Sequence, residues 1–362
     1  MSKKLFLFFL LTFMVFHLIS YEIEQISVTF IDPSRNNRQI PTQIFIPVES
    51  DSYRQDDQAF PFIVFGHGYL TSYSNYNTVW EAIVPLGWLM VFPTTEGGIL
   101  ANAEQFALDL AFLSYAVPAA GENPASFLYN LIEPTSVVMG HSMGGGCSVL
   151  AASYANNFES LVTLAAWRLF DSSPIDAALN VNLPSLTFAG ADDDFIPPPD
   201  NQLLIYQNLA SIYKSYILMN GVNHSQIYVN DHVFTLIGQW LDFALSDEID
   251  SLALFETTLE DFEFLNILSY MIENRYPPVN LTIDFDDGWM IISWDKALGA
   301  DDYIVEAADN PDSGFSDLSS FQGNFAEDDN RIFWSFQPTT DQNRLFFQVK
   351  IIRNLSRKND NL

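Results

Sequence analysis

A serine lies between two glycines in Gly140-His141-Ser142-Met143-Gly144, directly after an apolar run at residues 136–139. The run has the composition of a buried β-strand, and residues 143–154 have that of a helix. A serine on such a strand-to-helix turn holds its hydroxyl above the sheet, and the glycines avoid collisions with neighbouring backbone. The N-terminus of the helix also favours negative charge beside this serine. The pattern therefore predicts that Ser142 is a nucleophile, with a purely structural turn as the alternative.

A serine hydroxyl is a weak nucleophile until a nearby base takes its proton, and the sequence has five histidines to supply that base. His224 follows an apolar strand predicted at 215–219, at the edge of the sheet where open α/β folds place their chemistry. His17 lies in the N-terminal apolar segment, and the turn directs His141 away from the serine. We predict His224 as the base, with His232 at the start of a later helix as the alternative.

The third member of such a site is a carboxylate that orients the imidazole. Three adjacent aspartates, Asp192, Asp193 and Asp194, follow the strand predicted at 184–189. The residues alone leave the choice among them open. The two that do not serve are expected to be solvated carboxylates or ligands of a surface cation such as calcium.

Two backbone N–H groups are needed to bind the negative oxygen that forms when the nucleophile attacks. Met143 follows the nucleophile and is one expected donor. The other is expected from Gly66-His67-Gly68-Tyr69, after the strand predicted at 61–65, and we choose Tyr69. The side chains of His67 and Tyr69 are also candidates for substrate contact.

Alternating strands and helices must position these residues. The strands expected to build the sheet are at 26–31, 42–46, 61–65, 88–92, 136–139, 161–165, 184–189 and 215–219. Helices are expected at 103–115, 143–154, 201–212 and 233–245. Because several strands are apolar throughout, they indicate a sheet covered on both faces. The fold class is therefore α/β, with a mostly parallel central sheet and an antiparallel edge formed by the first two strands.

The chain divides by composition into a signal peptide, a catalytic domain, a connector, a small β domain and a tail. Lys3 and Lys4 precede an apolar run that is short for a membrane span, as in a secretory signal. The five parts are the signal peptide at 1–20, the α/β domain at 21–246, an acidic helical connector at 247–276, a β-sandwich at 277–353 and a polar tail at 354–362. The expected location is secreted or periplasmic, without stable membrane insertion after cleavage of the signal.

Charge and cysteine content exclude several classes of partner. The formal net charge is −30, and so acidic a surface repels nucleic acid. The single cysteine, Cys147, excludes an internal disulfide and a zinc site of the Cys/His type, and we expect it to be a buried filler. No metal and no organic cofactor is required, and we expect a monomer.

The segment 138–146 resembles the nucleophile segment of bacterial cutinases and polyester hydrolases. That group belongs to the dienelactone-hydrolase-like α/β-hydrolases and is similar to chlorophyllases and platelet-activating-factor acetylhydrolases. The resemblance covers roughly residues 25–245 and implies an α/β-hydrolase fold. Its acid motif matches Phe188-Ala189-x-x-x-Asp193-x-x-x-Pro197 and so singles out Asp193.

At other positions, some residues of this sequence match the group and others differ from it. Gly68-Tyr69 matches the oxyanion tyrosine of the group, and His224 follows a strand and a glycine-containing turn as its histidine does. Trp167 stands near the position of an aromatic clamp but lacks the preceding proline, and we expect it to contact substrate or to pack at the rim. His67 is more like general esterases and chlorophyllases. These departures, with the absence of the usual disulfide, favour general ester hydrolysis over polymer hydrolysis.

The C-terminal segment resembles a fibronectin type III module on the order of its strands, with Trp294 and Tyr303 as core aromatics. We expect it to be a spacer or to dock protein or carbohydrate.

The sequence leaves three candidate functions. The first is an exported serine esterase acting on a small or polymeric ester through Ser142, His224 and Asp193. The second is a serine peptidase of the same fold, because the same triad cleaves amides. The third is a surface-binding protein that uses the fold as a scaffold.

Overall fold

The structure is a computed structural model, and the predicted signal peptide at 1–20 lies outside the residues that it describes. Those are residues 21–48, 59–246, 249–274, 281–286, 288–295, 302–308, 316–317, 323–327, 331–337, 346–352 and 355–358. Contacts divide the chain into two compact units. The first holds most described residues up to Leu268, and the second holds those from Ser269 onward together with Ile212–Ser215.

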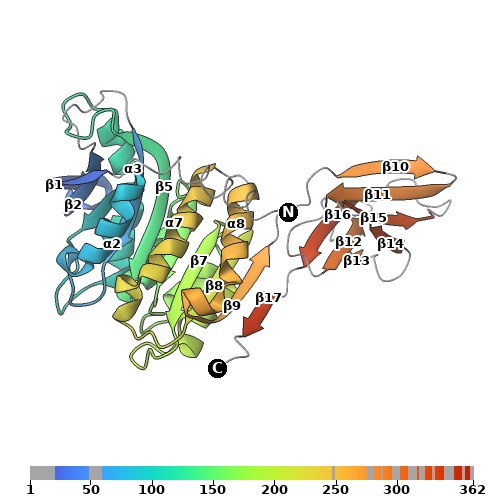
Figure 1. Ribbon diagram of the computed structural model, residues 1–362. Helices are drawn as coiled ribbons and strands as arrows, with labels where there is room; N and C mark the ends of the chain where they lie inside the picture. The colour runs from blue at the N-terminus through green and yellow to red at the C-terminus, as the bar shows by residue number, and fades with distance from the viewer. Residues whose placement is uncertain are drawn as a thin grey trace, which may run out of the picture. The chain divides into compact units, whose positions relative to one another are not determined.

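A central sheet organises the first unit (Figure 1). Its first eight strands lie in the order β1-β2-β4-β3-β5-β6-β7-β8. The bounds are β1 Glu22–Asp32, β2 Arg38–Val48, β3 Phe60–Gly66, β4 Leu89–Pro93, β5 Ile132–His141, β6 Ser160–Leu164, β7 Ser185–Gly190 and β8 Tyr213–Met219. The pairs from β4 through β3, β5 and β6 to β7 are parallel, whereas β1 and β2 form the expected antiparallel edge. The predicted α/β class and antiparallel edge are confirmed.

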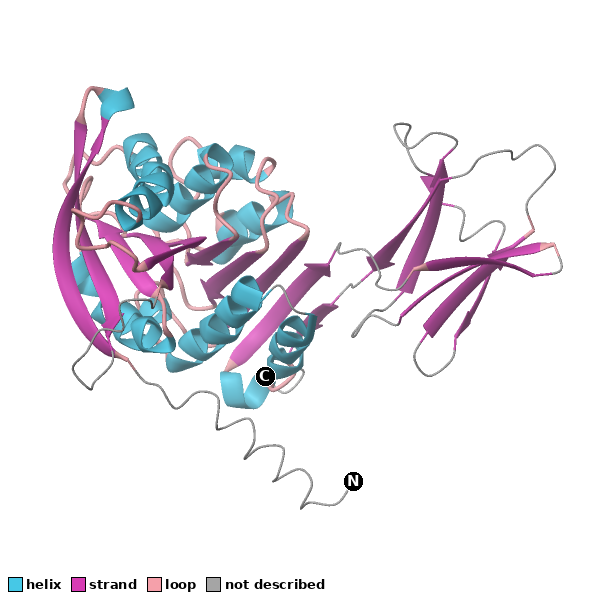
Figure 2. Cartoon of the chain, turned by 90° about the horizontal axis from the view of Figure 1, so that it is seen from above, coloured by secondary structure: helices cyan, strands magenta, loops and turns pink. Residues whose placement is uncertain are grey.

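Helices lie on both sides of the sheet (Figure 2). Their bounds are α2 Asn77–Ile83, α3 Ala103–Gly121, α4 Met143–Tyr154, α5 Ser173–Ala178, α6 Gln202–Asn208 and α7 Asp231–Ser246. The four predicted helices correspond to α3, α4, α6 and α7. The sequence reading missed α2 and α5, because helices this short contain too few turns to produce a clear apolar period. Within the described residues, no helix is both long and apolar enough to cross a membrane.

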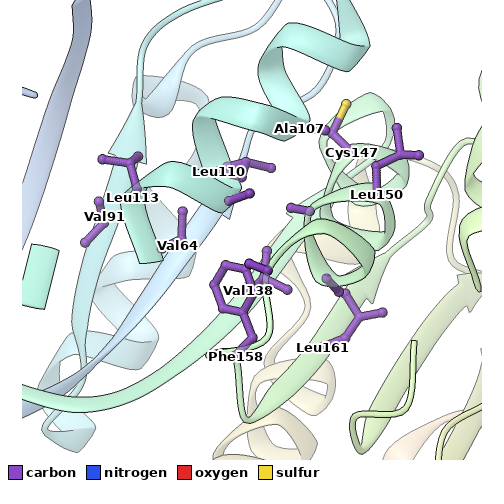
Figure 3. Close-up of a cluster of buried hydrophobic side chains, with 14 of the residues drawn as sticks. Val64, Val91, Ala107, Leu110, Leu113, Val138, Cys147, Leu150, Phe158 and Leu161 are labelled. Carbon is purple, nitrogen blue, oxygen red and sulfur yellow. The ribbon is translucent and has the colours of Figure 1, made fainter. Parts of the chain in front are cut away.

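The main core lies between α3, α4 and the strands beneath them (Figure 3). Val64, Val91 and Val138 come from three neighbouring strands and are fully buried beneath helix residues such as Leu110. Cys147 belongs to this core, as expected of a small buried filler, and its thiol donates to the Ala103 carbonyl at 3.3 Å. Burial raises the pKa of this thiol. A protonated, enclosed thiol has no nucleophilic role here.

The predicted connector at 247–276 is helical only in its first part. The structure forms α8 (Ile249–Leu259) and α9 (Phe262–Leu265), followed by strand β9 (Ile267–Asn274). β9 was missed because acidic residues interspersed with Leu and Phe suggested a helix over the whole segment. The predicted polar tail at 354–362 also contains a strand, β17 (Leu355–Lys358), which pairs antiparallel with β9. This short polar segment is a strand because its backbone pairs with β9, and its side-chain pattern does not reveal that pairing.

Two small sheets in the second unit share one core, as expected for a β-sandwich. One has the order β10-β11-β15-β14 and the other β13-β12-β16. Their bounds are β10 Thr282–Asp286, β11 Trp289–Asp295, β12 Asp302–Ala308, β13 Ser316–Asp317, β14 Gly323–Glu327, β15 Arg331–Phe336 and β16 Phe346–Ile352. Trp294 and Tyr303 contact each other across the sheets, with ring centroids 5.3 Å apart, and both lie in the core. Assignment to the fibronectin type III family stays a prediction.

A buried ion-pair cluster ties the β1–β2 hairpin to α3. Asp109 is fully buried and pairs with Arg35 and Arg38, each guanidinium nitrogen lying 2.7 Å from a carboxylate oxygen. The Thr95 hydroxyl also donates to Asp109 at 2.6 Å, and Arg38 pairs with Glu96 at 2.8 Å. The loop after β4 is therefore held by the same carboxylate as the hairpin.

The cluster predicts a large loss of stability when Asp109 is neutralised. Asp109→Asn keeps the side-chain shape but leaves two partly buried guanidinium groups without their shared counter-charge. We expect the free energy of unfolding to fall by about 3 kcal/mol in urea titrations. The control Asp176→Asn, at an exposed position, is expected to change it by less than about 0.5 kcal/mol. Equal effects of the two substitutions would refute a stabilising role for the cluster.

Candidate active site

Ser142 sits on a sharp turn between β5 and α4, as its flanking glycines predict. Its backbone has φ 57° and ψ −121°, a conformation that residues other than glycine rarely adopt. A Cβ atom on Gly144 would lie 2.0 Å from the Gly66 carbonyl oxygen, and one on Gly140 would lie 2.3 Å from the Gly144 oxygen. Only glycine lets β3, β5 and α4 approach this closely. The turn holds the Ser142 hydroxyl at the carboxyl end of β5.

The structure brings His224 to this hydroxyl. The Nε2 atom of His224 lies 2.9 Å from Ser142 Oγ, and its Nδ1 atom lies 2.7 Å from Asp193 Oδ2. Because a carboxylate only accepts, Nδ1 carries a hydrogen and donates to Asp193. In the neutral imidazole, Nε2 is then free to accept the serine proton. The three side chains come from separate loops that follow β5, β7 and β8.

Asp193 is distinguished from its two neighbours by burial. Its residue is 3% exposed, whereas Asp192 and Asp194 are both exposed. The second carboxylate oxygen, Oδ1, accepts the backbone N–H groups of Phe195 at 3.1 Å and Ile196 at 2.8 Å. These bonds fix the carboxylate in position to face His224. In the described part of the chain, no three His, Cys, Asp or Glu side chains are grouped so that they could hold a metal ion.

The loop after β3 packs directly against Ser142. A Cβ atom on Gly68 would lie 3.4 Å from the Ser142 Cβ atom. The Gly68 N–H donates to the Tyr76 hydroxyl at 2.8 Å, and no hydrogen bond among the described residues uses the N–H of Tyr69. Met143 begins α4, where N–H groups lack a partner in the preceding turn. Tyr69 thus lies next to the residue that packs on Ser142, and Met143 follows Ser142 directly at the start of α4.

The structure corrects the expectation for His67. Its side chain was a candidate for substrate contact, but the residue is 1% exposed. Its Nδ1 lies 2.9 Å from the Gly68 carbonyl oxygen, and its Nε2 lies 2.9 Å from that of Thr95. His67 is enclosed by backbone and braces the loop instead of lining an open surface. The burial of His67 depends on the backbone that folds around it, which the sequence does not show.

Several aromatic residues lie in the segments that contact Ser142 and His224, and sequence reasoning found only some of them. The backbone N–H of Trp167 donates to the Ser142 carbonyl at 2.9 Å. The partly exposed Trp167 ring contacts that of Phe170, with centroids 4.6 Å apart. Phe195 was missed. It is 76% exposed, and its ring centroid lies 5.3 Å from that of His224. Its position two residues after Asp193 could have identified it. The Tyr69 ring is exposed, and its hydroxyl donates to the Ile99 carbonyl at 2.7 Å.

His141 is a second residue whose surroundings the sequence did not reveal. The turn directs it away from the Ser142 hydroxyl, as expected, and its ring points instead toward Tyr76 and the backbone of His224. The residue is 4% exposed. Burial, together with the nearby imidazole of His224, lowers the pKa of His141 to about 3. His141 is therefore neutral in the folded protein at ordinary pH.

This lowered pKa predicts a pH dependence of stability. In the unfolded chain His141 titrates near its ordinary value of 6.5, so between that value and about 3 the unfolded state binds the additional proton. The free energy of unfolding should therefore decrease as the pH falls through this window. Urea titrations from about pH 7 to about pH 4 should give a shallower decrease for His141→Gln than for the parent protein. Parallel curves would contradict the assigned pKa.

Comparisons with known proteins identify the family of this chain. A family model described as PETase, PET hydrolase-like, matches residues 44–248. The chain is also similar to cutinase est1 of Thermobifida alba, with 27% identity over 176 residues. That match covers 48% of this chain and 56% of the cutinase, so the chain spans little more than half the length of this curated relative. Because the family model covers more than half of the chain and the fold is an α/β-hydrolase fold, the chain belongs to the PET hydrolase-like family of ester-hydrolysing enzymes.

Proposed function

We propose that the protein is an exported serine hydrolase that cleaves carboxylic esters through an acyl-enzyme. The observation that carries the proposal is the continuous chain from Ser142 Oγ to His224 Nε2 at 2.9 Å and from His224 Nδ1 to Asp193 Oδ2 at 2.7 Å. Hydrogen bonding at both ends of one imidazole is what nucleophilic catalysis by serine requires.

The reaction follows from the roles of these groups. Ser142 Oγ attacks the ester carbonyl carbon while His224 Nε2 takes the serine proton. The carbonyl oxygen becomes negative and accepts the N–H groups of Tyr69 and Met143. His224 then donates its proton to the leaving alcohol, and the acyl group stays on Ser142. A water molecule, deprotonated by His224, releases the acid and restores the serine. Asp193 stabilises the imidazolium in both halves.

The surroundings of Ser142 support a substrate with apolar groups. Phe195 contacts the ring of His224, and Trp167 and Phe170 contact each other beside the backbone of Ser142. An exposed aromatic ring beside His224, as that of Phe195 is, would contact the acyl or alcohol part of an ester. We include both small and polymeric esters in the proposed substrate class.

The location and the second unit belong to the proposal as well. The basic and then apolar composition of residues 1–20 supports export, to the medium or the periplasm. For the β-sandwich we propose a spacer or a docking role toward protein or carbohydrate.

The first prediction from this proposal concerns Ser142. Ser142→Ala removes the nucleophile and should lower kcat for p-nitrophenyl butyrate by at least about 10⁴-fold without changing the circular dichroism spectrum. Ser148→Ala is the control, because Ser148 is a buried serine on α4, the helix that follows Ser142, and its hydroxyl donates to the Gly144 carbonyl at 2.8 Å. It should retain activity within about tenfold.

A fluorophosphonate probe should label the parent protein at Ser142 and leave the Ser142→Ala variant unlabelled. An unlabelled parent without ester turnover would support the scaffold function instead. Faster hydrolysis of a matched amide than of the ester would favour a peptidase.

The second prediction separates the three aspartates. Asp193→Asn keeps the volume but replaces a carboxylate that accepts from His224 Nδ1, so the imidazole loses its preferred tautomer. We expect kcat to fall by about 10⁴-fold. Asp192→Asn and Asp194→Asn change exposed neighbours and should stay within about threefold of the parent. A larger loss in either neighbour than in Asp193→Asn would show that the acid has been assigned to the wrong residue.

A further inference from the structure

A chain of hydrogen bonds joins the loop after β3 to the loop after β8. The Gly68 N–H donates to the Tyr76 hydroxyl oxygen at 2.8 Å. The Tyr76 oxygen lies 2.9 Å from His141 Nδ1, and His141 Nε2 lies 3.0 Å from the carbonyl oxygen of His224. The chain thus runs from the loop that carries Tyr69 to the backbone of His224, and the bonds of Tyr76 and His141 in it do not involve the Ser142 hydroxyl.

The direction of each bond follows from the chemistry of its ends. The His224 carbonyl only accepts, so His141 Nε2 carries the hydrogen and donates to it. His141 is neutral, so its Nδ1 is an acceptor and the Tyr76 O–H donates to it. The Tyr76 oxygen accepts the Gly68 N–H with a lone pair. Every donor in the chain has an acceptor, so one tautomer of His141 satisfies all three bonds.

Aromatic packing encloses this chain. Tyr76 is fully buried, and its ring contacts those of Phe65 and Tyr228, with centroids 4.9 Å away in each case. Tyr228 lies four residues after His224, and its ring centroid is 4.6 Å from that of His141. A hydrogen-bond chain held in a buried aromatic cluster has little room to rearrange.

We propose that Tyr76 and His141 are positioning residues that set the spacing between the oxyanion-binding loop and His224. The inference rests on the proposed ester hydrolysis. Acyl transfer requires the N–H of Tyr69 and the Nε2 of His224 to be placed correctly at the same time. The two groups belong to loops far apart in the sequence, and the Tyr76–His141 chain links the residue before Tyr69 to the backbone of His224.

The test breaks this chain without removing the aromatic packing. Tyr76→Phe keeps the ring but removes the hydroxyl, so the Gly68 N–H and His141 Nδ1 lose their shared partner. Misplacement of reacting groups by a fraction of an ångström slows the chemical step more than it weakens binding. We expect kcat for p-nitrophenyl butyrate to fall by about 10- to 100-fold, with KM within about threefold of the parent.

Tyr216→Phe is the matched control. Tyr216 is a buried tyrosine on β8 whose ring contacts Tyr206, outside the chain described above. Tyr216→Phe also removes one phenolic oxygen from a buried ring. The kcat of this variant should stay within about twofold of that of the parent. Thermal unfolding of both variants reports whether each is folded at the assay temperature.

A double-mutant cycle tests whether Tyr76 and His141 act as one unit. His141→Gln places an amide nitrogen near the Nε2 position, so it keeps a donor for the His224 carbonyl but loses the acceptor for Tyr76. Both substitutions break the same Tyr76–His141 bond. The double variant should therefore be no more than about threefold slower than the slower single variant, whereas independent effects would multiply.

The outcomes separate the inference from the proposed function. If the parent protein shows neither ester turnover nor fluorophosphonate labelling of Ser142, the proposed function fails and the inference fails with it. If the parent is active and Tyr76→Phe matches Tyr216→Phe in kcat, the positioning role is refuted while the ester hydrolase stands. A multiplicative double variant, or a change confined to KM, also refutes it. If Tyr76→Phe does not fold, the kcat of His141→Gln is compared with that of Tyr216→Phe instead. A lower kcat for His141→Gln supports the positioning role, and an equal kcat refutes it.

Discussion

Close backbone contact between β3, β5 and α4 is the constraint on which the site depends. Gly66, Gly140 and Gly144 approach within distances that no side chain tolerates, and this contact holds Ser142 in a backbone conformation with φ 57°. Such a conformation costs on the order of 1–3 kcal/mol and persists only where surrounding structure enforces it. The buried core on α3 and α4 supplies that enforcement. The strained turn in return places the hydroxyl where two other loops can reach it.

Those loops meet because β7 and β8 are neighbours in the sheet. Asp193 follows β7, and His224 follows β8. Asp193 Oδ1 accepts two backbone N–H groups, and these bonds hold the other oxygen of the carboxylate toward His224. Backbone groups also lie against the Asp193 carboxylate and against both ring nitrogens of the enclosed His67. A site built in this way is organised before substrate binds, which is the condition for electrostatic stabilisation of a developing negative oxygen.

Much of the fold and of the site could be predicted from sequence because the signals are local. Apolar runs that alternate with helical segments specify the sheet strands and the longer helices, and the glycine-flanked Ser142 marks the strand-to-helix turn. His224 follows from elimination among few histidines. Three kinds of element were missed for different reasons. α2 has too few turns for a clear apolar period, the acidic residues mixed with Leu and Phe around β9 suggested a helix, and β17 is a strand through its pairing with β9.

The sequence by itself determined the fold class, predicted Ser142 as the nucleophile and His224 as the base, and narrowed the predicted acid to three adjacent aspartates. Tertiary structure decided which aspartate is buried against His224, that His67 is enclosed, and that His141 joins Tyr76 to the backbone of the base. The physical reason is that exposure and hydrogen-bond partners belong to the space around a residue. Residues such as Gly68 and His224, far apart in the chain, come to share that space only when the sheet has formed.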